Sequence, residues 1–198
     1  MNENIREPRQ KRAIEKKEKI IDAGFELFIS NGYYNTNTAE IAKKASVSTG
    51  IIYQYFKDKY DILIEGLNKY GNSIFFPLIN DEIDFSKDNF ENAIRSMISN
   101  YINAHKVSDT THEEIMAMVH SDKNVAEYYY NRELKMTDYI YNSLKKEFDD
   151  DYLYEKVHIM IGLIDNLCHE VIYHQHDHMN YDAMTDIVVK SIKDLFFK

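Results

Sequence analysis

The sequence predicts an all-α protein in which a small N-terminal three-helix unit precedes a larger helical part. Apolar residues recur at helical spacing along most of the chain, and no stretch alternates apolar and polar residues as a half-buried strand does. Only two Pro and six Gly occur among 198 residues, a length sufficient for one or two domains with a sizeable core. We therefore expect about nine helices and no sheet.

The first helix is expected over about residues 10–31, where Ile21, Phe25 and Phe28 share an apolar face and Asn31-Gly32 can end the helix in a left-handed conformation. Ser48, Ser86 and Ser121 are expected N-caps of later helices. In chain order, the later helices are expected at about residues 38–45, 48–56, 57–79, 87–107, 112–120, 122–148, 152–176 and 181–197.

The stretch from Asn37 to Lys59 is typical of two short helices joined by a tight turn. Helices this short cannot bury a core alone, but a thin second helix fits a DNA major groove, which admits one α-helix. The outward side of this second helix carries small groups, hydroxyls and an amide, and no charge before Lys57. An ordinary surface helix would carry several charges there, so the pattern favours a helix-turn-helix that reads DNA.

The charge of the chain is unevenly distributed. Residues 1–60 hold 11 Lys and Arg against 8 Asp and Glu, whereas residues 61–198 hold 13 against 25. An acidic surface is repelled by a phosphate backbone, and the local field decides binding rather than the overall net charge of −9. We therefore expect the N-terminal part to face DNA and the remainder to point away.

Residues of the N-terminal stretch occur in the order and at the spacing of a known family. The chain resembles the TetR family of bacterial transcriptional regulators over about residues 15–65, and beyond them only in length and helical content. The turn between the two short helices has Ser46 where the family usually has Gly, and we interpret this as tolerated variation, since such a turn can also close without a left-handed residue. The residues that carry the resemblance are Ala23, Phe28, Gly32, Tyr33, Thr38, Ile41, Ala42, Ala45, Val47, Ser48, Gly50, Tyr53, Phe56, Lys59 and Leu63.

The resemblance implies a set of DNA-contacting residues, and their chemistry agrees with that role. Gln54 can pair with adenine, and Thr49 can pack on a thymine methyl group. A hydroxyl and backbone N–H at the start of a helix suit a phosphate, as Thr38 would supply, and Lys59 is expected to be a plain phosphate contact. The full expected set is Asn37, Thr38, Ser48, Thr49, Gly50, Tyr53, Gln54, Tyr55 and Lys59.

The C-terminal part is expected to bind a ligand and to form a homodimer. The helix at about residues 152–176 is apolar on more than one face, so it is buried on more than one side. The resemblance implies that this helix and the last one pair with a second chain, through residues such as Ile164, Val171, Val188 and Ile192. It also implies a cavity for a small, largely apolar or aromatic ligand, for which Met97, Tyr101, Met116 and Tyr139 are the expected lining, although each residue also suits an ordinary core.

Metal-dependent chemistry has little support in the sequence. Asp165 and His169 lie one turn apart and are weak candidates for metal ligands, but a complete ligand set is missing, and no HExxH motif or Gly-rich phosphate loop occurs. Cys168 is the single cysteine and is expected to be a small buried side chain. No cofactor and no enzymatic activity are expected.

These observations predict a DNA-binding domain at residues 1–60 and a ligand-binding and dimerisation domain at residues 61–198. The expected function is that of a cytoplasmic repressor that a small molecule releases from a palindromic operator, without any membrane-spanning segment. Two alternatives remain open, namely a DNA-binding regulator without a small-molecule ligand and a metal-dependent helical-bundle enzyme.

Overall fold

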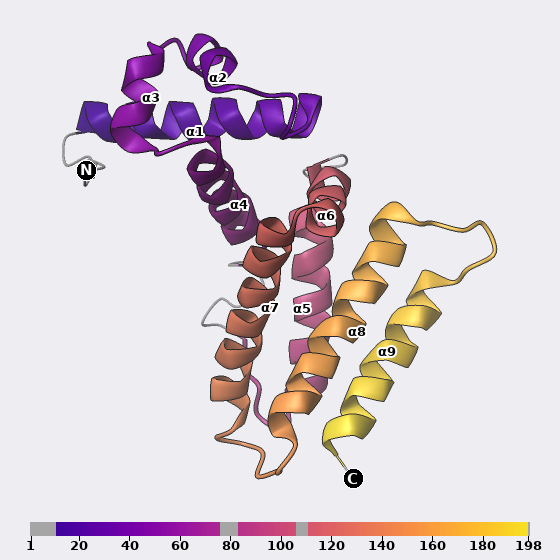
Figure 1. Cartoon of the computed structure of the whole chain (residues 1–198). Helices are drawn as coiled ribbons and strands as arrows, with labels where there is room; N and C mark the ends of the chain where they lie inside the picture. Colours follow the sequence, from indigo (N-terminus) through magenta and orange to yellow (C-terminus); the bar gives the residue numbers. More distant parts are fainter. Residues whose placement is uncertain (1–10, 76–82, 106–110, 198) are drawn as a thin grey trace. The chain divides into compact units, whose positions relative to one another are not determined.

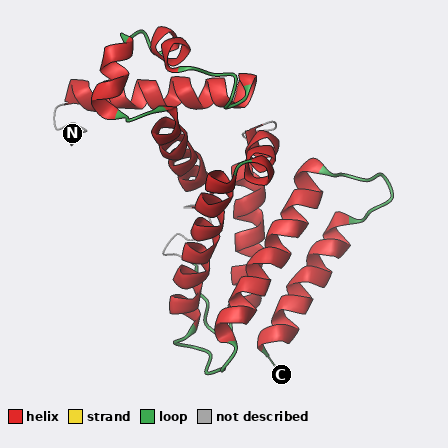
Figure 2. Ribbon diagram, viewed as in Figure 1, coloured by secondary structure: helices red, strands yellow, loops and turns green. Residues whose placement is uncertain are grey.

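A computed structural model describes residues 11–75, 83–105 and 111–197 of the chain. These residues form nine α-helices and no strand, which confirms the predicted all-α class (Figures 1 and 2). None of the described helices combines the length and apolar character that a membrane crossing requires. The helices are α1 (Lys11–Asn31), α2 (Thr38–Lys44), α3 (Thr49–Tyr55), α4 (Lys59–Phe75), α5 (Phe90–His105), α6 (Thr111–Ser121), α7 (Lys123–Leu144), α8 (Leu153–Tyr173) and α9 (Tyr181–Phe196).

The chain divides into two compact units, Met1–Asn72 and Ser73–Lys198. The structural boundary therefore lies inside α4 rather than after residue 60, because most of α4 packs on α1. The division of function between residues 1–60 and 61–198 remains a prediction.

The first unit is a small core built from four helices. Ile20 and Phe28 of α1, Ile41 of α2, Ile52 of α3 and Leu63 of α4 are each no more than 1% exposed. Because α2 and α3 have seven residues each, they depend on this shared core rather than on their own hydrogen bonds for stability.

The close packing of α4 against α1 requires a glycine. Gly66 is buried, and a Cβ atom at this position would lie 2.5 Å from Cδ2 of Phe25. An ion pair between Lys17 Nζ and Glu65 Oε1, 2.7 Å apart, joins the same two helices at the surface. Partly exposed pairs of this kind contribute little to stability, so the packing of Phe25 against Gly66 dominates the contact.

The turn between α2 and α3 closes through a left-handed residue. Ser46 has φ of 56°, and among the described non-glycine residues it is the one with positive φ. The backbone N–H of Ser46 donates to the carbonyl of Lys43, and that of Val47 donates to the carbonyl of Ala42. The turn therefore does use a left-handed residue and is not closed in the other way considered, and Ser46 holds a conformation that glycine adopts at lower cost.

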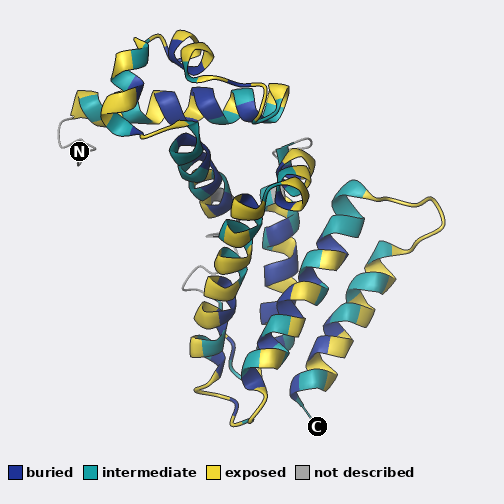
Figure 3. Ribbon diagram, viewed as in Figure 1, coloured by how far each residue is buried: buried dark blue, intermediate teal, exposed yellow. Residues whose placement is uncertain are grey.

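The second unit has its core among α5, α7, α8 and α9. One end of the core is aromatic, with the Phe90 ring centroid 5.4 Å from that of Phe148 and 4.9 Å from that of Phe196. Figure 3 shows α8 and α9 with both buried and exposed residues along their lengths. Each of these helices therefore leaves part of its surface uncovered within one chain.

Several helix ends differ from the predicted positions because other side chains cap them. Asp58 accepts hydrogen bonds from the N–H groups of Tyr60 and Asp61, so α4 begins at Lys59 instead of residue 57. Asp122 caps α7, whereas the hydroxyl of Ser121 donates to a carbonyl of α6.

Two further predicted helix ends concern the start of α5 and the end of α4. The chain around Ser86 forms a turn, and α5 begins only at Phe90. The expected end of α4 near residue 79 lies outside the described residues.

We predict that Ser46→Gly stabilises the first unit by about 0.5–1 kcal/mol, because glycine adopts positive φ without the steric cost that a Cβ atom brings. Ser48→Gly is the matched control, since Ser48 has φ of −78° and gains no such relief. The control should be neutral or destabilising. Chemical denaturation of both variants measures the difference, and a loss of stability in Ser46→Gly would contradict the strain assigned to this turn.

Candidate functional site

The start of α2 is a fully formed cap. Asn37 Oδ1 accepts hydrogen bonds from the N–H groups of Ala39 and Glu40 at 3.0 and 3.1 Å, and the Asn37 N–H donates to Glu40 Oε2 at 2.9 Å. This reciprocal capping box fixes the direction in which α2 begins. Asn37 is exposed as predicted, but its side-chain oxygen serves the helix cap.

Two of the predicted DNA-facing hydroxyls are joined to each other. Thr38 Oγ1 on α2 lies 3.1 Å from the Tyr53 hydroxyl on α3. Tyr53 is 54% exposed. The hydrogen bond holds the Tyr53 ring outward and links the two short helices at their exposed surface.

The outward surface of α3 is open and uncharged. Gly50 and Gln54 are exposed, and a Cβ atom on Gly50 would meet only Ser48 Oγ, at 3.9 Å. Thr49 and Tyr55 are half-buried at the edges of this surface. Nothing on this part of α3 therefore obstructs a close approach to the edges of bases.

Ser48 occupies the predicted N-cap position of α3, but its side chain makes no capping hydrogen bond. Its hydroxyl is exposed beside the first turn of the helix. The capping role expected for this hydroxyl was therefore wrong.

Lys59 differs most from its predicted role as a plain phosphate contact. Its Nζ donates to the carbonyl of Tyr33 at 2.7 Å and to that of Thr36 at 2.9 Å, and it lies 4.4 Å from the centroid of the Tyr33 ring. An ammonium group has three N–H donors, and two of them hold the turn between α1 and α2. Lys59 therefore ties the first residue of α4 to the chain that leads into α2.

Thr36 completes this turn, and the sequence analysis did not assign it a role. It is 1% exposed, and its hydroxyl is within hydrogen-bonding distance of the carbonyls of Leu27 and Gly32, at 3.2 and 3.0 Å. The sequence feature that could have indicated this role is a threonine four residues after Gly32, because a hydroxyl near the end of a helix can donate to its last carbonyls.

The residues expected to line a ligand cavity divide into two groups. Met97 and Tyr101 are buried at 1% and 4% exposure, and Met116 is half-buried. Tyr139 is 37% exposed on α7, so the expectation that it points inward was wrong. Because α7 carries apolar or aromatic residues on most of its sides, helical spacing alone did not show which side faces the core.

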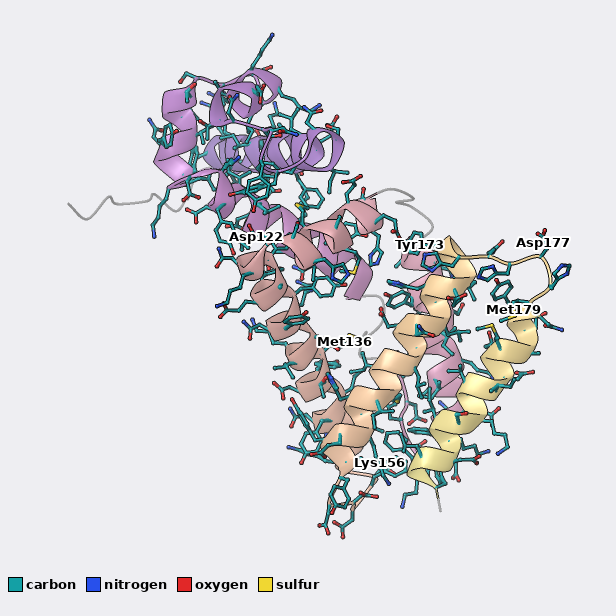
Figure 4. All side chains as sticks on the ribbon, turned by 45° about the vertical axis from the view of Figure 1, so that its right-hand side comes forward. Asp122, Met136, Lys156, Tyr173, Asp177 and Met179 are labelled. Carbon is teal, nitrogen blue, oxygen red and sulfur yellow. The ribbon has the colours of Figure 1, made fainter. Side chains whose placement is uncertain are left out.

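A polar and aromatic cluster joins α5, α6 and α8 around Tyr101. The Tyr101 hydroxyl donates to Asp165 Oδ1, and Asp165 Oδ1 lies 3.8 Å from His169 Nε2. The His169 ring centroid lies 4.5 Å from that of the buried His112, which stacks on Tyr173 with an interplanar angle of 10°. We call these five residues the Asp165 cluster; Figure 4 labels Tyr173 where α8 ends.

Electrostatics keep the Tyr101 hydroxyl a hydrogen-bond donor. Burial raises the pKa of Tyr101 well above its usual value of 10, and the neighbouring Asp165 carboxylate raises it further. Asp165 and His169 were also the weak metal candidates. Among the described residues, no three His, Cys, Asp or Glu side chains are arranged to hold a metal ion.

Cys168, the neighbour of His169 in sequence, is fully buried, as predicted for a small apolar side chain. Burial, together with the nearby Asp165, raises the pKa of the thiol to about 12. The thiolate is therefore scarce near neutral pH, which makes this cysteine unreactive.

The predicted dimer residues are largely used within one chain. Ile164 and Ile192 are 4% and 0% exposed and belong to the core of their own unit, so they are not available to a partner. Val171 and Val188 are half-buried against the same core. The sequence correctly indicated that α8 is apolar on several sides but did not show which side its own chain covers.

Comparisons with known proteins agree with this geometry. Residues 20–65 match the family model described as "Bacterial regulatory proteins, tetR family". The HTH-type transcriptional regulator HbdR of Aromatoleum sp. (strain CIB) is 55% identical over 49 residues, which cover 25% of this chain and 21% of that protein. The Fatty acid metabolism regulator protein of Bacillus subtilis (strain 168) is 52% identical over 46 residues, which cover 23% of this chain and 24% of that protein. The matched segment thus spans less than a quarter of either relative's own length.

Solved structures extend the likeness to the whole chain, at the level of the fold. A protein described as a TetR-family regulator from Syntrophomonas wolfei superposes with a TM-score of 0.69 and 23% identity, covering 93% of this chain and 96% of that chain. A transcriptional regulator from Aquifex aeolicus VF5 superposes with a TM-score of 0.63 and 18% identity, covering 91% and 99%. The second unit therefore has the fold of the C-terminal part of these regulators.

We predict that Lys59→Met loosens the turn before α2. Methionine keeps an apolar stem over Tyr33 but removes both hydrogen bonds that the ammonium group donates. A hydrogen bond from a charged group contributes about 1.5–3 kcal/mol to stability. Hydrogen exchange at the amides of residues 33–37 should rise by about tenfold or more, since ~1.4 kcal/mol corresponds to a factor of ten. Lys57→Met is the matched control, because Lys57 is exposed. Equal protection in both variants would show that Lys59 does not hold this turn.

Proposed function

We propose that the whole chain, whose residues 20–65 match the tetR family model, is a transcriptional regulator that binds double-stranded operator DNA as a homodimer. The observation that carries the proposal is the surface formed by α2 and α3. This surface combines the capped start of α2, the hydrogen-bonded hydroxyls of Thr38 and Tyr53, and the open, uncharged face of α3. Its parts suit phosphate contacts beside direct contacts to bases. The matched relatives are regulators, which speaks against an enzyme.

The two kinds of contact are assigned to different residues. Thr38 and Tyr53 would hold phosphate oxygens through their hydroxyls, which position the protein without reading sequence. Gln54 and Thr49 would contact base edges, with Gly50 allowing the helix to approach. Lys59 would act through the turn it holds and not as the main phosphate contact.

A dimer would place two copies of α3 in successive major grooves. Half-sites read by such dimers lie about one helical turn apart, roughly 34–36 Å. An effector that binds the C-terminal unit would favour a state with a different spacing of the two reading helices. A coupling of ~1–3 kcal/mol suffices for such a release from the operator, so we propose that the protein represses until an effector binds.

The partner surface is proposed on the outer sides of α8 and α9. Ile159 is 51% exposed and Ile187 is 64% exposed, so both apolar side chains are available for packing against a second chain.

We predict that Gln54→Ala relaxes the preference for one base pair of the operator, because a good side-chain contact to a base discriminates by about 1–3 kcal/mol. Tyr53→Phe removes only a hydroxyl and should weaken binding to all sequences by a similar factor. Selection from a randomised duplex library, followed by titration at fixed salt, measures both effects. A wild-type protein without any preferred sequence would contradict the proposed function itself.

We predict that Ile187→Lys shifts the protein toward monomers, because a lysine at the centre of an apolar interface would bury an unpaired charge. Leu134→Lys is the matched control, since Leu134 is 45% exposed on α7, away from the proposed surface. Sedimentation at micromolar concentration distinguishes the variants, and circular dichroism checks that both are folded. A wild-type protein that sediments as a folded monomer excludes the dimer.

A further inference from the structure

We propose that the Asp165 cluster is a binding site for an organic cation, a positively charged amine or quaternary ammonium group attached to an aromatic or apolar body. The inference rests on the proposed function, because it names the chemical class of the effector. It narrows the largely apolar ligand expected from the sequence by adding one positive charge.

The first step is the direction in which Asp165 faces. His158, Asp165 and His169 lie along one side of α8, at helical spacing. At one end of this row, His158 Nδ1 lies 3.1 Å from the Thr137 hydroxyl of α7. Farther along, Asp165 accepts from Tyr101 of α5, and His169 contacts His112 of α6. This side of α8 is therefore turned toward α5, α6 and α7 of its own unit.

The second step is the access of solvent to this side. The Asp165 side chain is 48% exposed, whereas its partner Tyr101 is 4% exposed and the nearby His112 is 2% exposed. Solvent therefore reaches the Asp165 carboxylate, while the hydroxyl and the ring beside it are almost fully covered. A small molecule that replaces this solvent would touch the carboxylate directly.

The third step is the charge at the cluster. Among the described residues, no Lys or Arg nitrogen lies within 4 Å of the Asp165 carboxylate, and His169 is its one ion-pair neighbour. Tyr101 donates a hydrogen bond without adding charge. With His169 neutral, the negative charge of Asp165 has no fixed cation to balance it. A cationic ligand would supply that balance, whereas an anionic ligand would be repelled.

The fourth step is the chemistry of the surrounding rings. Tyr101, His112, His169 and Tyr173 come from three helices and form a continuous series of aromatic contacts and hydrogen bonds with Asp165. Aromatic faces attract cations by about 0.5–2 kcal/mol and also cover apolar surface. An ammonium group beside the carboxylate, with its apolar body against the partly exposed rings of His169 and Tyr173, would use both parts of the cluster.

The test compares three probes of similar size at pH 8, where histidines are mostly neutral. The probes are phenyltrimethylammonium, its neutral shape analogue tert-butylbenzene, and the anion benzoate, each titrated calorimetrically into the full-length protein without DNA. We expect the cation to bind at least tenfold more tightly than the neutral analogue and benzoate to bind most weakly. Equal binding of cation and neutral analogue, a preference for benzoate, or no binding of any probe at millimolar concentration would overturn the proposal.

Two variants assign the preference to Asp165. Asp165→Asn keeps the size of the side chain and an acceptor for Tyr101, so it should abolish the preference for the cation and leave binding of tert-butylbenzene unchanged. The matched control is Asp138→Asn, which removes an exposed carboxylate on α7 that accepts from Tyr154 at 3.0 Å. This control should retain the full preference.

A second variant tests the proposal even if Asp165→Asn does not fold. Tyr101→Phe removes the hydrogen bond but keeps the carboxylate, so it should bind the cation as tightly as the wild type or more tightly. Loss of the cation preference in this variant would contradict the role of Asp165 as the anchor. These titrations contain no DNA, so a negative result would contradict the cation site and not the proposed DNA-binding function. Absence of operator binding by the wild-type protein would instead contradict the proposed DNA-binding function, whichever probe binds.

Discussion

The ammonium group of Lys59 is the point on which the geometry of the first unit depends. It donates to the carbonyls of Tyr33 and Thr36, which lie in the turn between α1 and α2. Because Lys59 is the first residue of α4, this contact joins the end of α1, the approach to α2 and the start of α4. Together with the capping box of Asn37 and the shared core, this contact positions α2, and the Thr38–Tyr53 hydrogen bond links α2 to α3.

The same contact gives a physical route by which a change in α4 would reach the DNA-facing surface. Any displacement of the start of α4 must either carry the turn along or break two short hydrogen bonds. The packing of Phe25 against Gly66 favours the first outcome, because α1 and the middle of α4 are then held together as well. Contacts from all four helices thus hold unit 1 together.

The sequence predicted those features that depend on local spacing. The all-α class, the two short helices after Asn37 and the start of α3 behind Ser48 follow from helical periodicity, although the Ser48 hydroxyl makes no capping hydrogen bond. The contacts of Lys59 were not predictable in this way, because its partners lie 26 and 23 residues earlier in the chain. The sequence indicated Asp165 only as a weak candidate for a metal ligand beside His169, because its partner Tyr101 is 64 residues away in the chain.

The residues whose predicted surface was wrong could not be placed from the sequence for another physical reason. Ile164 and Ile192 are apolar, and apolarity predicts that a residue is buried without saying whether its own chain or a second chain covers it. Tyr139 lies on a helix whose aromatic residues occupy several sides, so its exposure depended on packing that spacing does not encode.

The inert environment of Cys168 has a practical consequence. It is the single thiol of the chain, it is fully buried, and its pKa of about 12 leaves little thiolate to react. A cysteine introduced at an exposed position of α3, such as Gln54, would therefore be the reactive one. Spin labels or fluorophores could be attached there without first replacing the native cysteine, and the distance between the labels of two chains could be followed directly as an effector is added.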